Sequence, residues 1–295
     1  NHNVAIGQWA LQTEDVSAGN VAIGYKALQV QNTDSSNNVA IGHQAAAKLN
    51  GSKNSVYIGS TVASAETVSG IDNVVIGALA GEDITSAHSN TIIGNQAGLN
   101  IDTAANNVVI GKLAWGAGVG IASGGAAGQY NVIIGNDAGK AGTTANSNVI
   151  IGHNAMGPDA DTASQNVAIG HEAGKLFSGN AGNVAIGYKA MDGCNGGEHY
   201  NIAIGRDALG ADIAGSSYCV AIGDRALTAQ NADAKNTAVG GLCGDSITSG
   251  TGNTFVGYIA GAGTSTTDDN TAVGHMAYAK GTGANNTCLG WGAGS

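Results

Sequence analysis

The sequence predicts an all-β protein folded as a parallel β-solenoid, and three observations lead to this prediction. One motif, N-V-A-I-G-x-x-A, recurs from one end of the 295 residues to the other. The chain holds 49 Gly against one Pro, and only 11% of its residues are charged. Phe, Trp and Tyr together make 4%, so burial has to depend on many small side chains and not on interlocked aromatic rings.

The repeat is numbered from its first residue, which is position zero. Successive copies are 17 or 18 residues apart, except for one interval of 24 and one of 16. We expect about seventeen coils of 17–18 residues in a single domain spanning residues 1–295, with an insertion loop at about 115–130 in the long interval. The copies begin at Asn3, Asn20, Asn38, Ser55, Asn73, Asn90, Asn107, Asn131, Asn148, Asn166, Asn183, Asn201, Cys219, Asn236, Asn253, Asn270 and Asn286.

Positions one to three of each copy have the composition of a β-strand. Position one is β-branched and position three is Ile, Val or Leu in all seventeen copies, as in Val4 and Ile6. Because side chains alternate across a strand, positions one and three share a face, which we expect to be the interior. Position two, often Ala as in Ala5, then lies on the other face. That face is also mostly small or apolar, so we expect it to pack against another chain.

Equal positions of neighbouring coils are expected to touch. Position four is Gly in every copy, where a Cβ would obstruct a corner of the chain. Asn at position zero predicts a column of hydrogen-bonded side-chain amides. At position five Arg206 would lie beside Asp224. Position six alternates in sign through four successive repeats, which would stabilise a structural charge ladder. The ladder is Glu172, Lys189, Asp207 and Arg225.

Three segments carry a resemblance to a known family: NVAIGYKAL at 20–28, NVAIGYKAM at 183–191 and NTAVGHMAY at 270–278. They resemble the head repeats of trimeric autotransporter adhesins and, more closely, the N-T-A-I-G-Y-Q-A-L repeats of phage tail-fibre proteins. The resemblance covers essentially the whole chain. It implies a left-handed parallel β-roll, assembled as a homotrimer, that attaches to a cell surface or to extracellular matrix. The expected location is therefore extracellular, on a virion fibre or a bacterial surface.

Composition and motifs exclude several functions. With 11 Lys plus Arg against 21 Asp plus Glu, the net charge of -10 would repel nucleic acid. No apolar run approaches the roughly 20 residues that span a bilayer, so we expect no membrane insertion of this segment. No catalytic motif is present, and we expect neither an enzyme nor a cofactor. The acidic pairs are interpreted as solvated loop charges: Glu82 with Asp83, Asp159 with Asp161, and Asp268 with Asp269. The chain begins and ends inside a repeat, so we expect a piece of a longer protein.

Histidines and cysteines give two weaker signals. His153 and His171 occupy position five of adjacent coils, close enough to share a transition metal, but an exposed polar site is the favoured interpretation and no metal is expected. The four cysteines fall at four different repeat positions, so they would not stack within disulfide distance. We expect free, buried thiols at Cys194, Cys219, Cys243 and Cys288.

Receptor contact should involve residues that break the repeat. Trp115 opens the insertion, while Tyr200 and Tyr218 precede the strand in adjacent coils and would present stacked rings to a receptor glycan or protein. The leading hypothesis is a non-enzymatic attachment fibre that binds multivalently. One alternative is a structural filament that polymerises by end-to-end coil stacking. Ice binding needs an exposed Thr array, whereas the Thr residues at position one lie on the face predicted to be buried. They are Thr91, Thr237, Thr254, Thr271 and Thr287.

Overall fold

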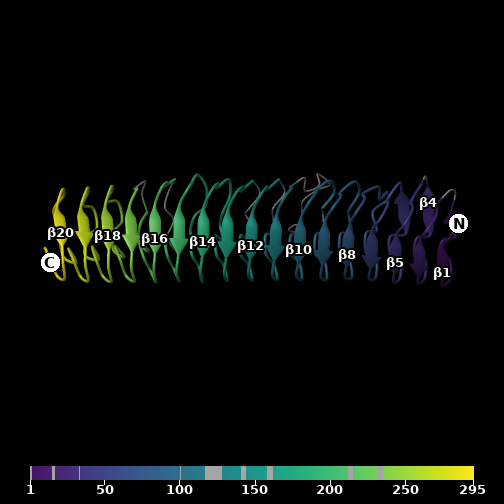
Figure 1. Ribbon diagram of the computed structural model, residues 1–295, viewed down its shortest axis with the longest axis horizontal. Coiled ribbons are helices and arrows are strands. Elements are labelled where there is room, and N and C mark those ends of the chain that lie inside the picture. The colour runs from purple at the N-terminus through teal and green to yellow at the C-terminus, as the bar shows by residue number, and fades with distance from the viewer. Residues whose placement is uncertain are drawn as a thin grey trace. The chain divides into compact units, whose positions relative to one another are not determined.

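The structure is a computed structural model that describes residues 2–14, 17–32, 34–99, 101–116, 128–140, 144–157, 162–211, 215–231 and 235–295. The chain divides into two compact units, Asn1–Ser147 and Asn148–Ser295. Each unit by itself is a parallel β-solenoid, and the described residues of neither unit form a helix (Figure 1). The predicted all-β parallel solenoid is confirmed, while the single domain over residues 1–295 stays a prediction.

The first unit contains one strand for each of its eight copies of the repeat. Each strand pairs in parallel with the strand of the next copy, residue for residue, as Val21 with Val39 and Ile23 with Ile41. These strands are β1 (Val4–Ile6), β3 (Val21–Ile23), β5 (Val39–Ile41), β7 (Val56–Ile58), β8 (Val74–Ile76), β9 (Thr91–Ile93), β10 (Val108–Ile110) and β11 (Val132–Ile134). A second small sheet comprises β2 (Thr13–Glu14), β4 (Val30–Asn32) and β6 (Lys48–Asn50).

The second unit continues the same arrangement over nine copies. Val167 pairs with Val184, and Val184 with Ile202, so equal repeat positions lie next to one another from coil to coil. The in-register stacking that the repeat predicts is therefore confirmed within each unit. The strands are β12 (Val149–Ile151), β13 (Val167–Ile169), β14 (Val184–Ile186), β15 (Ile202–Ile204), β16 (Val220–Ile222), β17 (Thr237–Val239), β18 (Thr254–Val256), β19 (Thr271–Val273) and β20 (Thr287–Leu289).

The predicted assignment of the two strand faces is wrong. Position two is the buried one, as at Ala22, Val75 and Ile92, whereas positions one and three on either side of it are half-buried or exposed. β-Branched side chains suit either face of a pleated strand, so their presence does not identify the inside. Size does not decide the matter, since Ala22 and Ile92 are both buried there; the course of the chain does, because it brings position eight of each coil over position two.

Large and small residues compensate for one another between positions two and eight in several coils. Small Ala22 at position two accompanies Leu28 at position eight, and both are buried. Where Phe255 fills position two, position eight is Gly261, and a Cβ there would lie 2.3 Å from the Phe255 ring. Such compensation is expected of an interior packed at the density of an organic crystal.

The Gly at position four lies where the backbones of consecutive coils approach closely. Gly240 has φ +139°, a conformation that L side chains rarely adopt. A Cβ on Gly240 would lie 2.4 Å from the carbonyl oxygen of Gly257, the equivalent residue of the next coil. Backbone cannot move aside there without breaking the hydrogen bond from Gly257 N–H to the Val239 carbonyl. The absence of a side chain at this corner is thus a condition for stacking.

Two neighbouring glycines provide a test of this corner. We expect Gly240→Ala to lower the free energy of unfolding by roughly 2 kcal/mol or more, because φ strain and a backbone clash coincide. Gly241→Ala should change it little, since Gly241 has ordinary φ and its added Cβ would lie 3.4 Å from the nearest atom of Tyr258. Urea denaturation of both variants measures the difference. Equal losses at the two sites would contradict the explanation.

Candidate interaction surface

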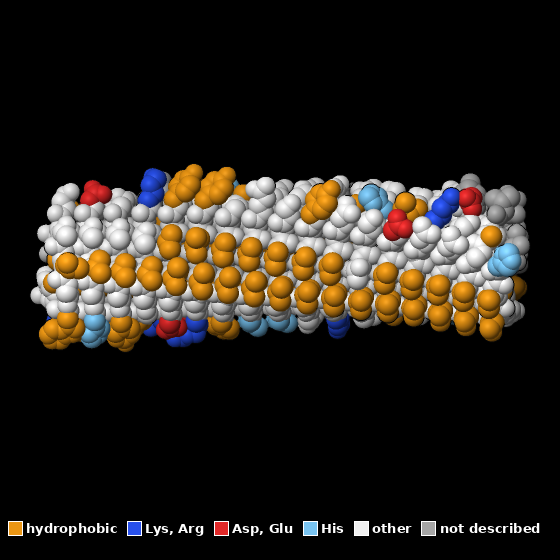
Figure 2. Space-filling view, in the orientation of Figure 1, with side chains coloured by type: hydrophobic (Ala, Val, Ile, Leu, Met, Phe, Trp, Pro, Cys, Tyr) orange, Lys and Arg blue, Asp and Glu red, His pale blue; other side chains and the backbone are white. Residues whose placement is uncertain are grey.

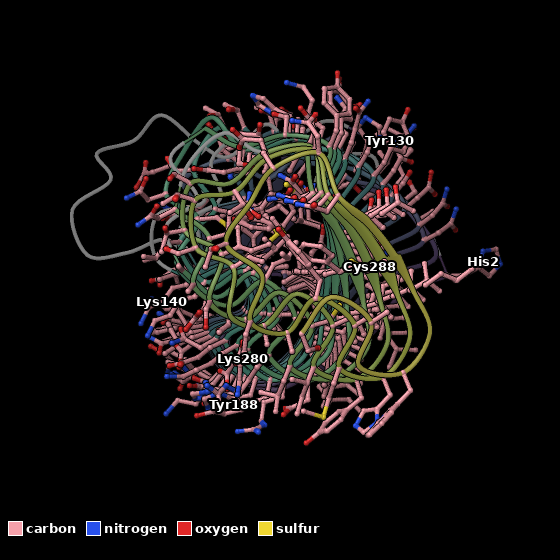
Figure 3. The ribbon with its side chains drawn as sticks, turned by 90° about the vertical axis from the view of Figure 1, so that its left-hand side faces the viewer. His2, Tyr130, Lys140, Tyr188, Lys280 and Cys288 are labelled. Atoms are coloured by element: carbon pink, nitrogen blue, oxygen red, sulfur yellow. The ribbon has the colours of Figure 1, made fainter. Side chains whose placement is uncertain are left out.

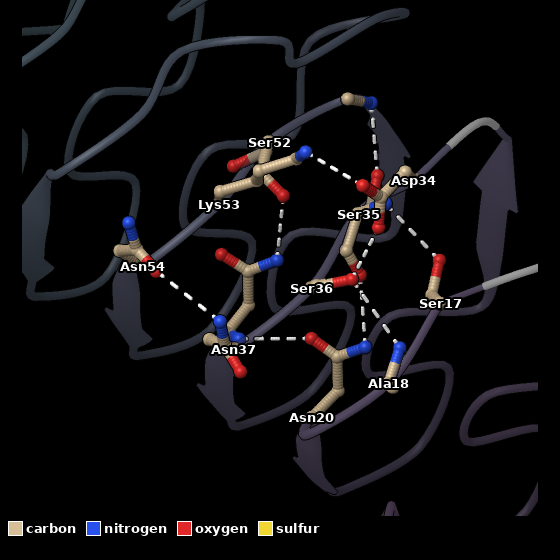
Figure 4. A network of polar contacts seen from close by, with 12 residues as sticks. Ser17, Ala18, Asn20, Asp34, Ser35, Ser36, Asn37, Ser52, Lys53 and Asn54 are labelled. Atoms are coloured by element: carbon tan, nitrogen blue, oxygen red, sulfur yellow. Dashed lines mark hydrogen bonds and ion pairs between the residues drawn. The ribbon is translucent and has the colours of Figure 1, made fainter. Parts of the chain in front are cut away.

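Asn at position zero is part of the buried scaffold. The Asn183 N–H donates to Oδ1 of Asn166 at 2.9 Å, and Asn183 Nδ2 donates to the Glu198 carbonyl at 2.8 Å. The Asn201 N–H in turn donates to Oδ1 of Asn183 at 2.9 Å. Figure 4 shows the same pattern in the first unit, where Asn20 Nδ2 donates to the Ser35 carbonyl at 2.8 Å. The predicted amide column is confirmed, and it also ties each strand to the return loop of its own coil.

The column continues past the position where Asn is replaced by Cys. The Cys219 N–H still donates to Oδ1 of Asn201 at 2.8 Å. Gln230, buried in the return loop, donates from Nε2 to Ser216 Oγ and accepts at Oε1 from Asn236 Nδ2, at 3.2 and 3.1 Å. Gln230 therefore supplies the side-chain amide that Cys219 lacks. The repeat alignment alone did not find this replacement, because Gln230 lies outside the motif.

The outward side chains of positions one and three form a surface that we call the outer sheet face. It carries Val or Ile in most coils, and Ile204, Ile222, Val256 and Val273 are each 36% exposed. Rows of hydrophobic side chains follow this face within each unit (Figure 2). Contiguous exposed apolar side chains are a common feature of interaction sites. The face is the first candidate functional surface of the chain.

The threonines of position one also lie on the outer sheet face. In the second unit four of them form an unbroken column from β17 to β20, in which Thr254, Thr271 and Thr287 are exposed. The argument that these threonines are buried is therefore wrong, and it no longer weighs against ice binding. A regular hydroxyl array is still confined to these four coils, because Val or Ile occupies position one in the other coils except at Thr91.

Position five carries stacks of aromatic rings along one rim of the outer sheet face, interrupted in the second unit by charged residues and Gly. In the second unit the ring centroids of His153 and His171 are 5.1 Å apart, and those of His171 and Tyr188 are 5.3 Å apart, with nearly parallel planes. Figure 3 shows Tyr188 pointing away from the coil. Among the described residues no three His, Cys, Asp or Glu side chains form a cluster that would hold a metal ion. The two imidazoles do lie together, as predicted from the spacing, but as a stack of parallel rings.

The four residues proposed as a charge ladder occupy successive coils. Glu172 accepts from Lys175 Nζ at 3.0 Å and lies 3.6 Å from Lys189 Nζ. The hydrogen bond from Lys175 is the main cause that lowers the pKa of Glu172, and the charge of Lys189 adds to it.

Further along the ladder, the shortest cation–carboxylate contacts involve position five. Arg206 contacts Asp224 through two bonds, Nε to Oδ1 at 2.7 Å and Nη2 to Oδ2 at 3.0 Å, and its Nη1 lies 3.6 Å from Asp207. Arg225 lies in register, because its N–H donates to the Arg206 carbonyl at 2.8 Å.

Tyr200 and Tyr218 lie on the opposite rim, each one residue before position zero and two residues before strand β15 or β16. Their side chains are 56% and 61% exposed, their centroids are 5.5 Å apart and their planes differ by 16°. Each ring covers one face of the other, and the Tyr200 ring also packs over Gly182, where a Cβ would lie 2.7 Å from the ring. The pair therefore offers hydroxyl groups and ring edges more than open faces, which does not favour sugar stacking on Tyr200.

Trp115 is not a surface residue. Its side chain is 2% exposed at position eight of its coil, and Gly128 lies against its ring. The suggestion that Trp115 contacts a receptor does not hold, because its large side chain fills the interior at position eight. Residues 117–127 of the predicted insertion, and the pair Asp159 and Asp161, lie outside the described residues.

The remaining candidate groups have structural explanations. Cys194, Cys219 and Cys243 are buried, as predicted, whereas Cys288 is only half-buried. Burial raises the pKa of the Cys243 thiol to about 12, which keeps it protonated and unreactive. Burial also raises the pKa of Glu82 and Asp83, with a contribution from neighbouring negative charge.

Asp268 accepts from the Thr251 N–H at 2.8 Å and so caps a loop of the preceding coil. In the described part of the chain, no helix is long and apolar enough to cross a membrane. Comparison of the chain with protein-family models, curated proteins and solved structures finds no match. The arguments for function therefore rest on the repeat and on the surfaces that it builds.

A double-mutant cycle tests whether charges in neighbouring coils interact. Combining Arg206→Gln with Asp224→Asn should reveal a coupling of about 0.5–1 kcal/mol in urea denaturation, because the bidentate pair is exposed and partly screened. The coupling should shrink as salt is added. Arg206→Gln combined with Asp268→Asn, several coils away, should be additive. Additivity in both cycles would show that the Arg206–Asp224 contact does not stabilise the stack.

Two tryptophans of the first unit separate core from surface. Trp115→Ala should cost about 3–5 kcal/mol of unfolding free energy, because it leaves a large cavity in the coil interior. Trp9→Ala removes a side chain that is 43% exposed and should cost far less. Thermal or urea unfolding followed by circular dichroism measures both. A Trp115→Ala protein as stable as the Trp9→Ala protein would contradict the buried position.

Proposed function

We propose that this chain is the shaft or head of an extracellular attachment fibre or adhesin, and that it acts without catalysis. The observation that supports the proposal best is the outer sheet face, an apolar surface that repeats in every coil of each unit. A protein that worked alone would leave these Val and Ile side chains in water. Both carriers suggested by the repeat, a virion fibre and a bacterial surface, are compatible with this function.

The partner proposed for the outer sheet face is the same chain. Three copies would wind as left-handed β-rolls and bring their outer sheet faces together around one axis, as the resemblance to fibre and adhesin repeats implies. Equal coil spacing supports self-association, because a second copy matches the first in every coil while an unrelated surface does not. Burying Val and Ile at positions one and three would stabilise the assembly by roughly 25 cal/mol for each Å² of apolar surface taken from water.

The rims remain available for attachment in such an assembly. The column at position five and the column before the strand carry most of the exposed rings, including Tyr188 and Tyr258. A homotrimer presents each of these residues three times, so weak contacts to a cell-surface glycan or protein receptor are multiplied by effective concentration. Binding by a rigid, repeated display is the proposed mechanism.

Charged substitutions on the outer sheet face test the assembly. We expect sedimentation equilibrium to give three times the chain mass of 28.8 kDa for the unchanged protein and one chain mass for Ile186→Lys, because a buried unpaired ammonium is costly. Ser246→Lys, on an exposed return loop, is the matched control and should stay trimeric. A monomeric unchanged protein would refute self-association. Open-ended polymers that lengthen with concentration would favour the end-to-end filament instead.

Attachment is tested separately with the same variants. Fluorescently labelled protein is applied to intact bacterial cells and to matrix-coated surfaces, and the retained fraction is measured after washing. The unchanged protein and Ser246→Lys should be retained. Ile186→Lys should lose most retention, because a single chain presents each contact once and not three times. Retention of none of the three proteins would contradict an attachment role, even if the homotrimer is present.

A further inference from the structure

Tyr200 and Tyr218 make the only ring contact between two tyrosines in the described residues. Their rings stack with centroids 5.5 Å apart, and both side chains are more than half exposed. The other stacked tyrosines have histidine neighbours: Tyr25 lies on His43, Tyr188 lies on His171, and Tyr258 lies on His275. Two phenols are thus held together, in reach of solvent, at one place in the second unit.

Backbone contacts before and after the pair hold the two rings one coil apart. On the N-terminal side, His199 and Ser217 form a parallel bridge. On the C-terminal side, Ile202 of β15 pairs with Val220 of β16.

The pair itself is also fixed by its backbone. The Tyr218 N–H donates to the His199 carbonyl at 3.3 Å, and both tyrosines have left-handed φ, 58° and 65°. Since Gly182 supports the far side of the Tyr200 ring, this ring is positioned against Tyr218.

We propose that Tyr200 and Tyr218 are a site of oxidative modification, where a peroxide-driven one-electron oxidant joins them as dityrosine. Each phenol gives up one electron and one proton and becomes a phenoxyl radical. The two radicals form one carbon–carbon bond between ring positions next to the oxygens. The hydrogens of the coupled carbons then move to the oxygens as aromaticity returns. Two electrons and two protons are lost in total, and they reduce one hydrogen peroxide to two waters.

Geometry makes this pair more reactive than the other exposed tyrosines. A phenoxyl radical on Tyr200 meets a second phenol in contact, so coupling is intramolecular and benefits from a high effective concentration. A radical on Tyr188 or Tyr258 has an imidazole as its ring neighbour, and imidazole does not yield dityrosine. Tyr130, 63% exposed in the first unit, makes no ring contact with another tyrosine among the described residues.

The product would be a covalent link between the coils of β15 and β16. It closes a loop between residues 200 and 218 and restricts the unfolded chain, in the way a disulfide does. Such a link resists reducing agents, unlike a disulfide. It would stabilise the stack of coils irreversibly, and it requires neither the homotrimer nor a receptor.

Peptide mapping tests the proposal directly. The full chain, dilute enough to disfavour contact between molecules, is treated with hydrogen peroxide and a haem peroxidase, and its cysteines are alkylated. Trypsin cleaves after Lys189, Arg206 and Arg225, so each tyrosine falls in its own peptide, 190–206 or 207–225. We expect these two peptides to appear joined, with a mass lower than their sum by two hydrogen atoms, and with dityrosine fluorescence.

Conservative variants provide the controls. Tyr218→Phe and Tyr200→Phe keep the stacked rings and should each abolish the joined peptide, while Tyr258→Phe should leave it unchanged. The oxidised protein should unfold at higher urea than the untreated protein, and Tyr218→Phe should show no such shift. Cross-links spread over Tyr130, Tyr188 and Tyr258 would overturn the proposal. N-acetyltyrosine in the same tube shows whether the oxidant is active. If it is coupled and the joined peptide is absent, the proposal is also overturned.

Discussion

The structure of each unit depends on one constraint, which is that equal positions of successive repeats lie in register. Gly at position four and Asn at position zero enforce it by different means. Gly240 lets two backbones approach to a distance that excludes a Cβ. Asn183 accepts at Oδ1 from the backbone N–H of the next Asn and donates from Nδ2 to its own return loop. A shift of one residue would break both sets of contacts and exchange the inward and outward side chains of the strand.

Register also determines how surfaces form on this protein. A residue gains a neighbour 17 or 18 positions away, so side chains of one kind gather into columns without being close in sequence. Arg206 contacts Asp224, His153 stacks on His171, and the outer sheet face runs through every coil. A column of this kind stabilises the stack of coils, because its residues bind to one another across neighbouring coils. Surfaces left unsatisfied within a single chain, above all the outer sheet face, are therefore where function is proposed.

Much of the fold was predictable from the sequence because its determinants are local and repeated. Strand positions, the Gly corner, the Asn column and the order of coils follow from a motif present seventeen times. The candidate sites were less predictable. Trp115 seemed a surface residue from its place at an insertion, but it fills the interior at position eight, where the available space depends on the residue at position two. Gln230 replaces the side-chain amide that is missing at Cys219, and it does so from a return loop that has no repeated motif.

The sequence by itself determined that this chain forms parallel strands at a period of 17–18 residues and that like positions meet. Tertiary structure alone decided which strand face is inside. Both faces of the strand are apolar, so alternation does not distinguish them, and the answer depends on the side toward which the chain turns after the strand. The chain turns so that position eight lies over position two, as Gly261 does over Phe255, and it leaves Val21 and Ile23 outside. The apolar surface proposed for assembly exists for this reason.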